Sequence, residues 1–457
     1  MLFDSANREL FRRVWSLSWP MVVYNVLEMT VGLVDLFMVR PFGPAATAAI
    51  GVSRQLTFLV EASAIAISTG VITLVSQAVG ARASNQVDNV VQQSVRLVLL
   101  FGIPTALAGY LLSRPLLVLL NARAEMLAYA VPYLHVYFSG LVFSWGCIVG
   151  TAIFRGTGDV LTPLKLGLVV NVLNVVLNYV LIYGIGPLPA FEVQGAALGT
   201  VAARGCGALI FLGLLLRETS HVRLRCGADQ AAAGRSWLGF DWKLIGRMMR
   251  IGVPMAMAGV LRNGSRLVFL AIVGASALGV SFHAAVGVGM QVRLLSILPA
   301  LAFQVATATL VGQAVGRGDY QEAEALGRRS VQLLAMLMIV VVVLIFAFAD
   351  PLAVLFASPE VAELAATVLR WFAVAQLFSA LSIGTQGTLM GAGDTAPTLR
   401  YTLLTQWVVM LPLAYLLLMT FGWEPAGPLA AWTLAPVISL ALMQRRFRSG
   451  RWKTLRA

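Results

Sequence analysis

The chain has 457 residues, of which 59% are hydrophobic and only 12% are charged. Soluble globular domains carry about 25% charged residues, so this composition excludes a soluble protein and indicates a membrane protein. The net charge is +13, but the cations gather in polar segments between apolar runs, which argues against a nucleic-acid partner.

Apolar runs of the roughly 20 residues that cross a bilayer as a helix recur from end to end. In chain order we predict spans at 14–38, 47–78, 88–112, 127–152, 164–184, 194–216, 248–273, 282–314, 328–350, 361–390, 399–421 and 428–445. None shows the period-2 alternation of a membrane β-barrel strand, and a helix satisfies its own backbone in lipid. The predicted fold class is an all-α polytopic membrane protein with twelve transmembrane helices.

Basic residues gather before the first span, in the polar segment 217–247, and in the tail after the last span. If all three regions are cytoplasmic, an even number of spans separates them, and six plus six fits. The opposite loops hold few cations, namely Arg40, Arg114 and Arg123, as the positive-inside rule requires. We therefore predict that both termini are cytoplasmic and that the basic regions contact membrane lipid.

The two halves of the sequence resemble each other. TLVSQAVGAR at 73–82 matches TLVGQAVGRG at 309–318, and FRGTGDVLTP at 154–163 matches LMGAGDTAP at 389–397, both at a shift of about 235 residues. The second half is thus a tandem copy with the same topology, a parallel repeat that suits a transporter rocking about a central cavity. The predicted domains are an amino-terminal six-helix lobe (1–216), a cytoplasmic basic linker (217–247) and a carboxy-terminal six-helix lobe with a basic tail (248–457).

Cofactor motifs are missing from the sequence. The glycines of FRGTGD and LMGAGD follow long spans and lack the lysine of a nucleotide-binding loop, so we expect them to end helices, with Asp159 and Asp394 as solvent-side caps. The three cysteines lie far apart, without the spacing of a metal site. We predict no metal, no cofactor and no nucleotide partner, so that energy must come from an ion gradient.

Several segments resemble the multidrug and toxic compound extrusion (MATE) family. They are the repeated RGTGD and GAGDT motifs, Pro20 in the first span, QAVGAR at the end of the second, and NVLNVVLNYVLIYG and GAALGT in the fifth and sixth. The resemblance implies two pseudo-symmetric six-helix bundles in a V shape, in a bacterial inner membrane. It also implies a transporter, not an enzyme, that exports amphiphilic, often cationic compounds against an inward flow of protons or sodium.

Asp35 is an acid within the first span, in MTVGLVDLFMVR. A charge at membrane depth costs about 2.5–3.5 kcal/mol, so Asp35 should face the bundle interior, where desolvation favours its neutral form. It could load and release one proton per transport cycle, or bind a cation directly. The resemblance assigns ion coupling to this aspartate. Pro20, in the same helix, is the predicted conformational hinge.

Asn171, Asn174 and Asn178 follow each other at spacings of three and four, which places them on one helix face. The resemblance places Asn174, Asn178 and the hydroxyl of Thr200 in a cation site with Asp35. Archaeal members of the family carry an aspartate at the position of Asn178, so this chain retains a single carboxylate, which disfavours sodium. The alternative role for these amides is hydrogen bonding between helices.

Three further residues are candidates for substrate contact or for tuning Asp35. Glu28 lies two turns before Asp35 on about the same face. Glu61 could pair with Arg54, seven residues earlier, or face the central cavity. Tyr24 would contribute an aromatic surface to a promiscuous cavity.

The second half differs from the family's sodium-coupled branch. Arg262, eight residues after Pro254, stands where that branch has a glutamate, and the tenth span contains no acid. The twin position of Asp35 is Phe269. This pattern resembles the DNA-damage-inducible-type branch and places any ion site in the first half. A cavity lined by Arg262, Arg266 and Arg293 would instead favour anionic groups.

These observations predict a monomeric secondary antiporter for a small amphiphilic substrate, coupled to protons, with sodium as the alternative ion. A flippase for a lipid-linked or anionic amphiphile is the rival function, and a non-transporting membrane scaffold has less support. No residue is predicted to be catalytic.

Overall fold

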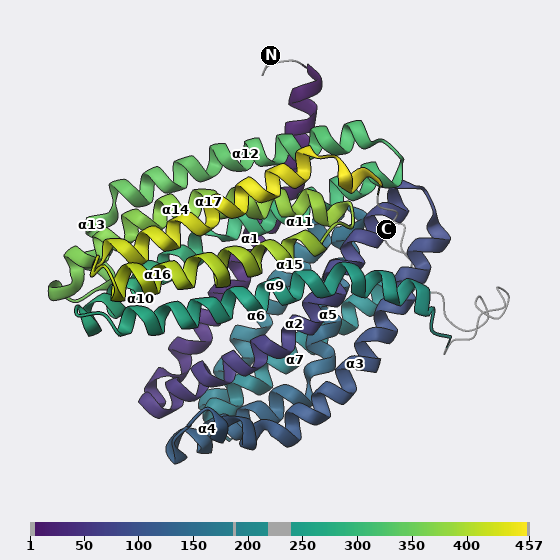
Figure 1. The fold of residues 1–457 in the computed structure, drawn as a ribbon. Helices are drawn as coiled ribbons and strands as arrows, with labels where there is room; N and C mark the ends of the chain where they lie inside the picture. Colours follow the sequence, from purple (N-terminus) through teal and green to yellow (C-terminus); the bar gives the residue numbers. More distant parts are fainter. Residues whose placement is uncertain (1–4, 186–188, 218–238, 455–457) are drawn as a thin grey trace. The chain divides into compact units, whose positions relative to one another are not determined.

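The apolar runs form helices, because only hydrogen bonds within the segment satisfy a backbone in lipid. The computed structural model describes residues 5–185, 189–217 and 239–454 (Figure 1). The helices of the first half are α1 (Ser5–Val39), η1 (Arg40–Phe42), α2 (Pro44–Gly80), α3 (Ser84–Leu119), α4 (Ala124–Ser139), α5 (Leu141–Thr157), α6 (Leu161–Tyr183) and α7 (Glu192–Leu216).

The second half is also helical, but its spans break at different places. Its helices are α9 (Trp242–Gly274), α10 (Gly279–Ser296), α11 (Leu298–Gly316), α12 (Tyr320–Ala347), α13 (Ala349–Phe356), α14 (Pro359–Gly391), α15 (Ala396–Thr402), η2 (Leu403–Met410), α16 (Leu411–Met419), α17 (Ala426–Arg448) and η3 (Arg451–Thr454). No described residue is in a β-strand. The predicted all-α fold class is confirmed.

Eleven segments of the described chain are long and apolar enough to span a membrane, and α4 with α5 forms a twelfth that is bent by 55°. The bend lies at Gly140, where an added methyl group would overlap the side chain of Val201 on α7. The predicted single span 127–152 is therefore a broken span. The eleventh span is also irregular: η2 is π-helical, and Pro412 after it has no N–H for the preceding turn.

The chain divides into two compact units. One unit consists of residues 23–253. Within it, α6 and α7 approach closely because α7 presents Gly195 and Gly199 four residues apart; a Cβ on Gly195 would lie 2.5 Å from the carbonyl oxygen of Leu181. Small residues at this spacing are typical of tight helix contacts in membranes. The start of α9 belongs to this unit too, since Gly252 lies against the backbone of Ala66 on α2.

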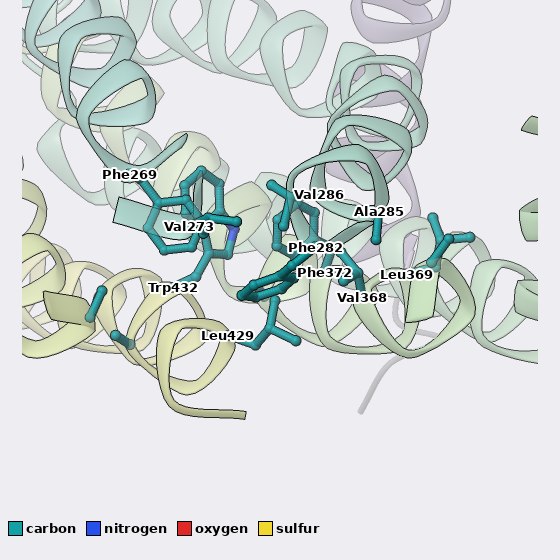
Figure 2. Close-up of a cluster of buried hydrophobic side chains, with 14 of the residues drawn as sticks. Phe269, Val273, Phe282, Ala285, Val286, Val368, Leu369, Phe372, Leu429 and Trp432 are labelled. Atoms are coloured by element: carbon teal, nitrogen blue, oxygen red, sulfur yellow. The ribbon is translucent and has the colours of Figure 1, made fainter. Parts of the chain in front are cut away.

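The other unit consists of residues 1–22 and 254–457. Its α14 packs against α10, α11, α12 and α17. One core cluster is aromatic (Figure 2): the rings of Phe372 and Trp432 stack with centroids 5.1 Å apart, and Phe269 lies 4.6 Å from Trp432. A second cluster includes Val14 of α1 and Phe303 of α11.

These units do not begin and end where the predicted lobes do. The start of α1, up to Val22, packs with the second half, and the start of α9 packs with the first. The predicted linker, 217–247, lies mostly outside the described residues. The lobes at 1–216 and 248–457 therefore stay a prediction.

Candidate functional site

A polar cavity lies inside the unit of residues 23–253, with an empty volume of about 620 Å³. Its walls come from α1, α2, α5, α6 and α7, so five helices must pack correctly to form it. Several residues predicted from the sequence line it together: Tyr24, Glu28, Asp35, Asn171, Asn174 and Thr200. The fold therefore brings two acids and two amides of the row, Asn171 and Asn174, to one cavity.

A continuous chain of hydrogen bonds joins four of the predicted residues across three helices. Asn178 Nδ2 donates to Asp35 Oδ1 at 2.7 Å and to Asn174 Oδ1 at 3.2 Å. Asn174 Nδ2 donates to Thr200 Oγ1 at 3.1 Å. The Thr200 hydroxyl in turn donates to the carbonyl of Ala196, one turn earlier in α7. The spacing of four residues on α6 thus aligns both amides with the acid on α1.

Asn178 stands behind Asp35 and does not itself line the cavity. Its side chain is fully buried between α6 and α7, where Gly199 faces it, and a methyl group on Gly199 would overlap Asn178 Oδ1. That Oδ1 has no hydrogen-bond partner among the described residues. If Asn178 moved, its buried Nδ2 would lose its partners and would cost the free energy of desolvation. The two bonds that Nδ2 makes therefore hold Asn178 in this position.

Asn171 takes no part in the hydrogen-bond chain from Asp35 to Thr200. Its side chain is buried at the cavity wall, and its Nδ2 makes no hydrogen bond to any described residue. An unused donor at a cavity wall can serve a bound molecule. Asn171 therefore lines the cavity together with Asn174, consistent with the helix face that their spacing indicated, but it takes no part in the hydrogen-bond chain.

Tyr24 is held from two sides. The Arg155 guanidinium lies 4.4 Å from its ring centroid, a cation–π contact, and Gly167 of α6 leaves room for the ring on the other side. Glu28 follows one turn later on α1 and lines the same cavity. The structure thus places both residues in the cavity that Asp35 also lines, while their roles stay a prediction.

The partner of Glu61 corrects one expectation. Its Oε1 accepts from Arg204 Nη1 at 3.1 Å and from the Tyr137 hydroxyl at 2.6 Å, so the pairing with Arg54 is wrong. Seven residues along a helix is about 10.5 Å, whereas α7 brings Arg204 directly opposite. Arg54 instead lies over Gly32, one turn before Asp35. The sequence did contain a signal for this pairing, because Arg204 is a cation within a predicted span and such a cation needs an acidic partner.

Pro20 is buried inside α1, two residues before the division between the two units at Val22, and it is not among the residues that line the cavity. A proline within a helix lacks the N–H that would bond to the preceding turn, which weakens the helix there. Its role as a hinge stays a prediction.

The unit of residues 1–22 and 254–457 differs at the position matching Asp35. Phe269 is fully buried in the aromatic cluster of Figure 2, so the twin of the acid is core. Arg262 and Arg266 of α9 are half-buried in this unit, and Arg293 of α10 lines a small cavity there. Arg262 therefore does not belong to the cavity of Asp35.

The two Gly-Asp motifs also differ from each other. Asp159 caps α6, since it accepts from the backbone N–H of Thr162 at 3.0 Å. Asp394 is buried and accepts from Arg446 Nε at 2.7 Å. The solvent-side cap predicted for Asp394 is therefore wrong, because α17 brings an arginine against it.

Comparison with known proteins gives the family. The MatE family model matches residues 20–180 and 254–416, which is most of the chain and both repeats. The probable multidrug resistance protein NorM of Thermotoga maritima is 28% identical over 97% of this chain and 94% of its own. The NorM relative of Rhodopseudomonas palustris is 27% identical over 96% and 91%.

A solved structure has the same fold. It is described as the outward-facing conformation of a multidrug resistance MATE family transporter of the MOP superfamily. It superposes with a TM-score of 0.88, at 21% identity over 96% of both chains. Members of this family are transporters in membranes and not enzymes, as the motifs predicted. With the family match over both halves, the chain belongs to the MatE family.

Proposed function

We propose that the protein is a secondary antiporter that exports amphiphilic compounds, cationic ones above all, in exchange for inward protons coupled through Asp35. The observation that supports this most directly is the hydrogen-bond chain from Asp35 through Asn178 and Asn174 to Thr200. It connects the intramembrane acid to two further helices. The names of the NorM relatives as multidrug resistance proteins agree with such a substrate class.

Protonation of Asp35 changes this chain at one defined bond. The ionised carboxylate is a strong acceptor for Asn178 Nδ2, and charge-assisted bonds are about twice as strong as neutral ones. A proton taken up in the outward-open state neutralises Asp35, weakens its bond to Asn178, and shifts α1 about Pro20. A cationic compound then loses a counter-charge in the cavity and leaves. In the inward-open state Asp35 releases the proton and a new substrate binds.

The amide at position 178 favours the proton over sodium. Asn178 presents its NH₂ group, a donor, to Asp35, whereas a sodium ion would need oxygen ligands there. A single carboxylate also supplies less negative charge than two. We place the protein in a bacterial inner membrane with both termini cytoplasmic, acting as a monomer.

The test is efflux of ethidium, a cationic amphiphile, from proteoliposomes with a proton gradient or a sodium gradient imposed separately. We expect the proton gradient alone to drive efflux and Asp35→Asn to abolish it. The matched control is Asp350→Asn, which removes an acid whose side chain is 66% exposed. Proton-driven efflux at the wild-type rate in Asp35→Asn would refute coupling through Asp35. Efflux driven by sodium alone at fixed pH would refute the proton as the ion.

One observation favours a second function, a flippase for an anionic or lipid-linked amphiphile. Arg262, Arg266 and Arg293 form a cationic group within one unit, and the guanidinium groups of the first two interact electrostatically with the third. In the same proteoliposomes, movement of an anionic lipid analogue between leaflets without any ion gradient would favour the flippase over the antiporter.

A further inference from the structure

We propose that the unit of residues 1–22 and 254–457 contains a binding site for the anionic head group of an amphiphile, formed by Arg293 and Gln376. The head group is a phosphate or a carboxylate. This site is separate from the cavity of Asp35, and the proposal does not depend on proton coupling.

Arg293 is held in place by aromatic rings. Its Cζ lies 5.5 Å from the centroid of the Trp432 ring, and Trp432 is itself fixed between Phe269 and Phe372 (Figure 2). None of the ion pairs between described residues includes Arg293. A guanidinium group that is oriented by a ring face keeps its N–H donors available for a ligand.

The surroundings of Arg293 add positive charge. Arg262 and Arg266 act on it electrostatically as like charges. Two acids of this unit have other partners: Asp350 pairs with Arg370 at 2.6 Å and Asp394 pairs with Arg446 at 2.7 Å. Cations in spanning segments normally pair or mark a substrate path. Here the missing counter-charge is best supplied by a ligand.

Gln376 provides the second, independent observation. It lines the same cavity as Arg293, and its side chain is only 1% exposed. Neither its Nε2 nor its Oε1 has a hydrogen-bond partner among the described residues. A fully buried amide with both ends unused carries the full cost of desolvation. An oxygen anion would accept from Nε2 and from the Arg293 fork at once.

The rest of the cavity indicates what carries the anion. The cavity is narrow and partly open, and apolar side chains such as Val292, Leu369 and Phe372 form much of its wall. One oxygen of a head group would enter between Arg293 and Gln376, and an alkyl chain would run outward along the apolar side chains. The ligand is therefore an anionic amphiphile, either a membrane lipid or a transported compound.

The experiment measures binding of dodecyl phosphate to the full-length protein in a neutral maltoside detergent, by isothermal titration without an ion gradient. Dodecyltrimethylammonium, the cation of equal chain length, is the comparison ligand. We expect dodecyl phosphate to bind more tightly than the cation, and Arg293→Gln and Gln376→Leu each to weaken it at least about tenfold. Arg370→Gln removes a cation of the same unit from a solvent-facing ion pair and should leave the affinity unchanged.

Two further measurements make every outcome decisive. Thermal unfolding shows whether each variant is folded, and Arg293→Lys, which keeps the charge, should recover part of the affinity. Competition by inorganic phosphate would identify a free anion as a sufficient ligand, whereas competition only by phosphatidylglycerol in nanodiscs would identify a lipid. Absence of dodecyl phosphate binding, or equal affinity in the wild type, Arg293→Gln and Gln376→Leu, would overturn the proposal.

Discussion

Asn178 is the residue through which the acid on α1 contacts the polar side chains of α6. Its Nδ2 bonds to Asp35 at 2.7 Å and to Asn174 at 3.2 Å. Replacing the amide by a carboxylate would place two acids within hydrogen-bond distance. Two carboxylates that close cannot both ionise without a cation or a shared proton between them. The identity of residue 178 therefore bears directly on the choice of coupling ion.

Asn178→Asp should consequently make efflux respond to sodium. We expect ethidium efflux from proteoliposomes at fixed pH to rise severalfold with an imposed sodium gradient in this variant, and not in the wild type. Asn171→Asp is the matched control, because Asn171 lies on the same helix but outside the hydrogen-bond chain. If Asn178→Asp stays insensitive to sodium, the second carboxylate is not what selects the ion.

Helical spacing predicted the residues of the cavity better than it predicted their partners. Asn174 and Asn178 share a face because they are four residues apart, and an intramembrane acid has to face inward. Asp35 and both amides of the hydrogen-bond chain were therefore predictable. The Glu61–Arg204 pair joins residues 143 positions apart. That contact depends on the tertiary fold, in which α4 and α5 each pack against both α2 and α7, and a single sequence does not contain it.

At the scale of helices, the contact between α6 and α7 positions the site. Gly199 allows α7 to approach so closely that it touches Asn178, and an added methyl group would overlap the amide. The helix would have to shift, or Asn178 would have to leave Asp35. Glycine within a helix costs about 1 kcal/mol relative to alanine, so its presence here reflects packing.

Gly199→Ala should therefore impair transport in the same way as loss of Asn178, although residue 199 does not touch the cavity. We expect proton-driven efflux to fall at least about tenfold, while the protein remains folded in detergent. Gly213→Ala, on the same helix with no atom within 4 Å of an added Cβ, should keep wild-type efflux. Normal efflux in Gly199→Ala would show that α7 tolerates the shift.

The lengths of the helices were predictable and their distortions were not. Most predicted spans end within a few residues of the observed helices, because apolar runs and the Gly, Pro and Asp residues between them set those limits. The bend of 55° between α4 and α5 occurs where Val201 of another helix meets Gly140. Distortion of that kind depends on a neighbour, and hydropathy does not report it.

At the scale of the whole chain, the tandem repeat describes covalent order and does not fix which helices pack together. The boundary between the two compact units cuts the first helix of each half beside a proline. In α1 it lies after Val22, two residues beyond Pro20, and in α9 it lies immediately before Pro254. Contacts such as Arg13 with Glu322, 309 positions apart, place the start of α1 with the second half. The repeat nevertheless explains why both divisions occur at matching prolines.

The span count and the charge distribution together predict the orientation of the chain. Eleven spanning segments and one bent pair make an even number, so both ends should face the same side. Arg445, Arg446 and Arg448 occupy the last turn of α17, and moving such a cluster across the membrane against the potential is unfavourable. We therefore expect the end of α17 to be cytoplasmic and the turn between α3 and α4 to face outward.

Single cysteines in a cysteine-free background test this orientation. A membrane-impermeant maleimide should label Ala124→Cys, at the exposed start of α4, in cells whose inner membrane is intact. It should label Ser449→Cys, at the exposed end of α17, only after the inner membrane is permeabilised. Labelling of both positions from outside would mean an even number of spans between them, whereas the six-plus-six topology places an odd number there. Such a result would contradict the six-plus-six topology, because an inverted chain would instead label Ser449→Cys alone.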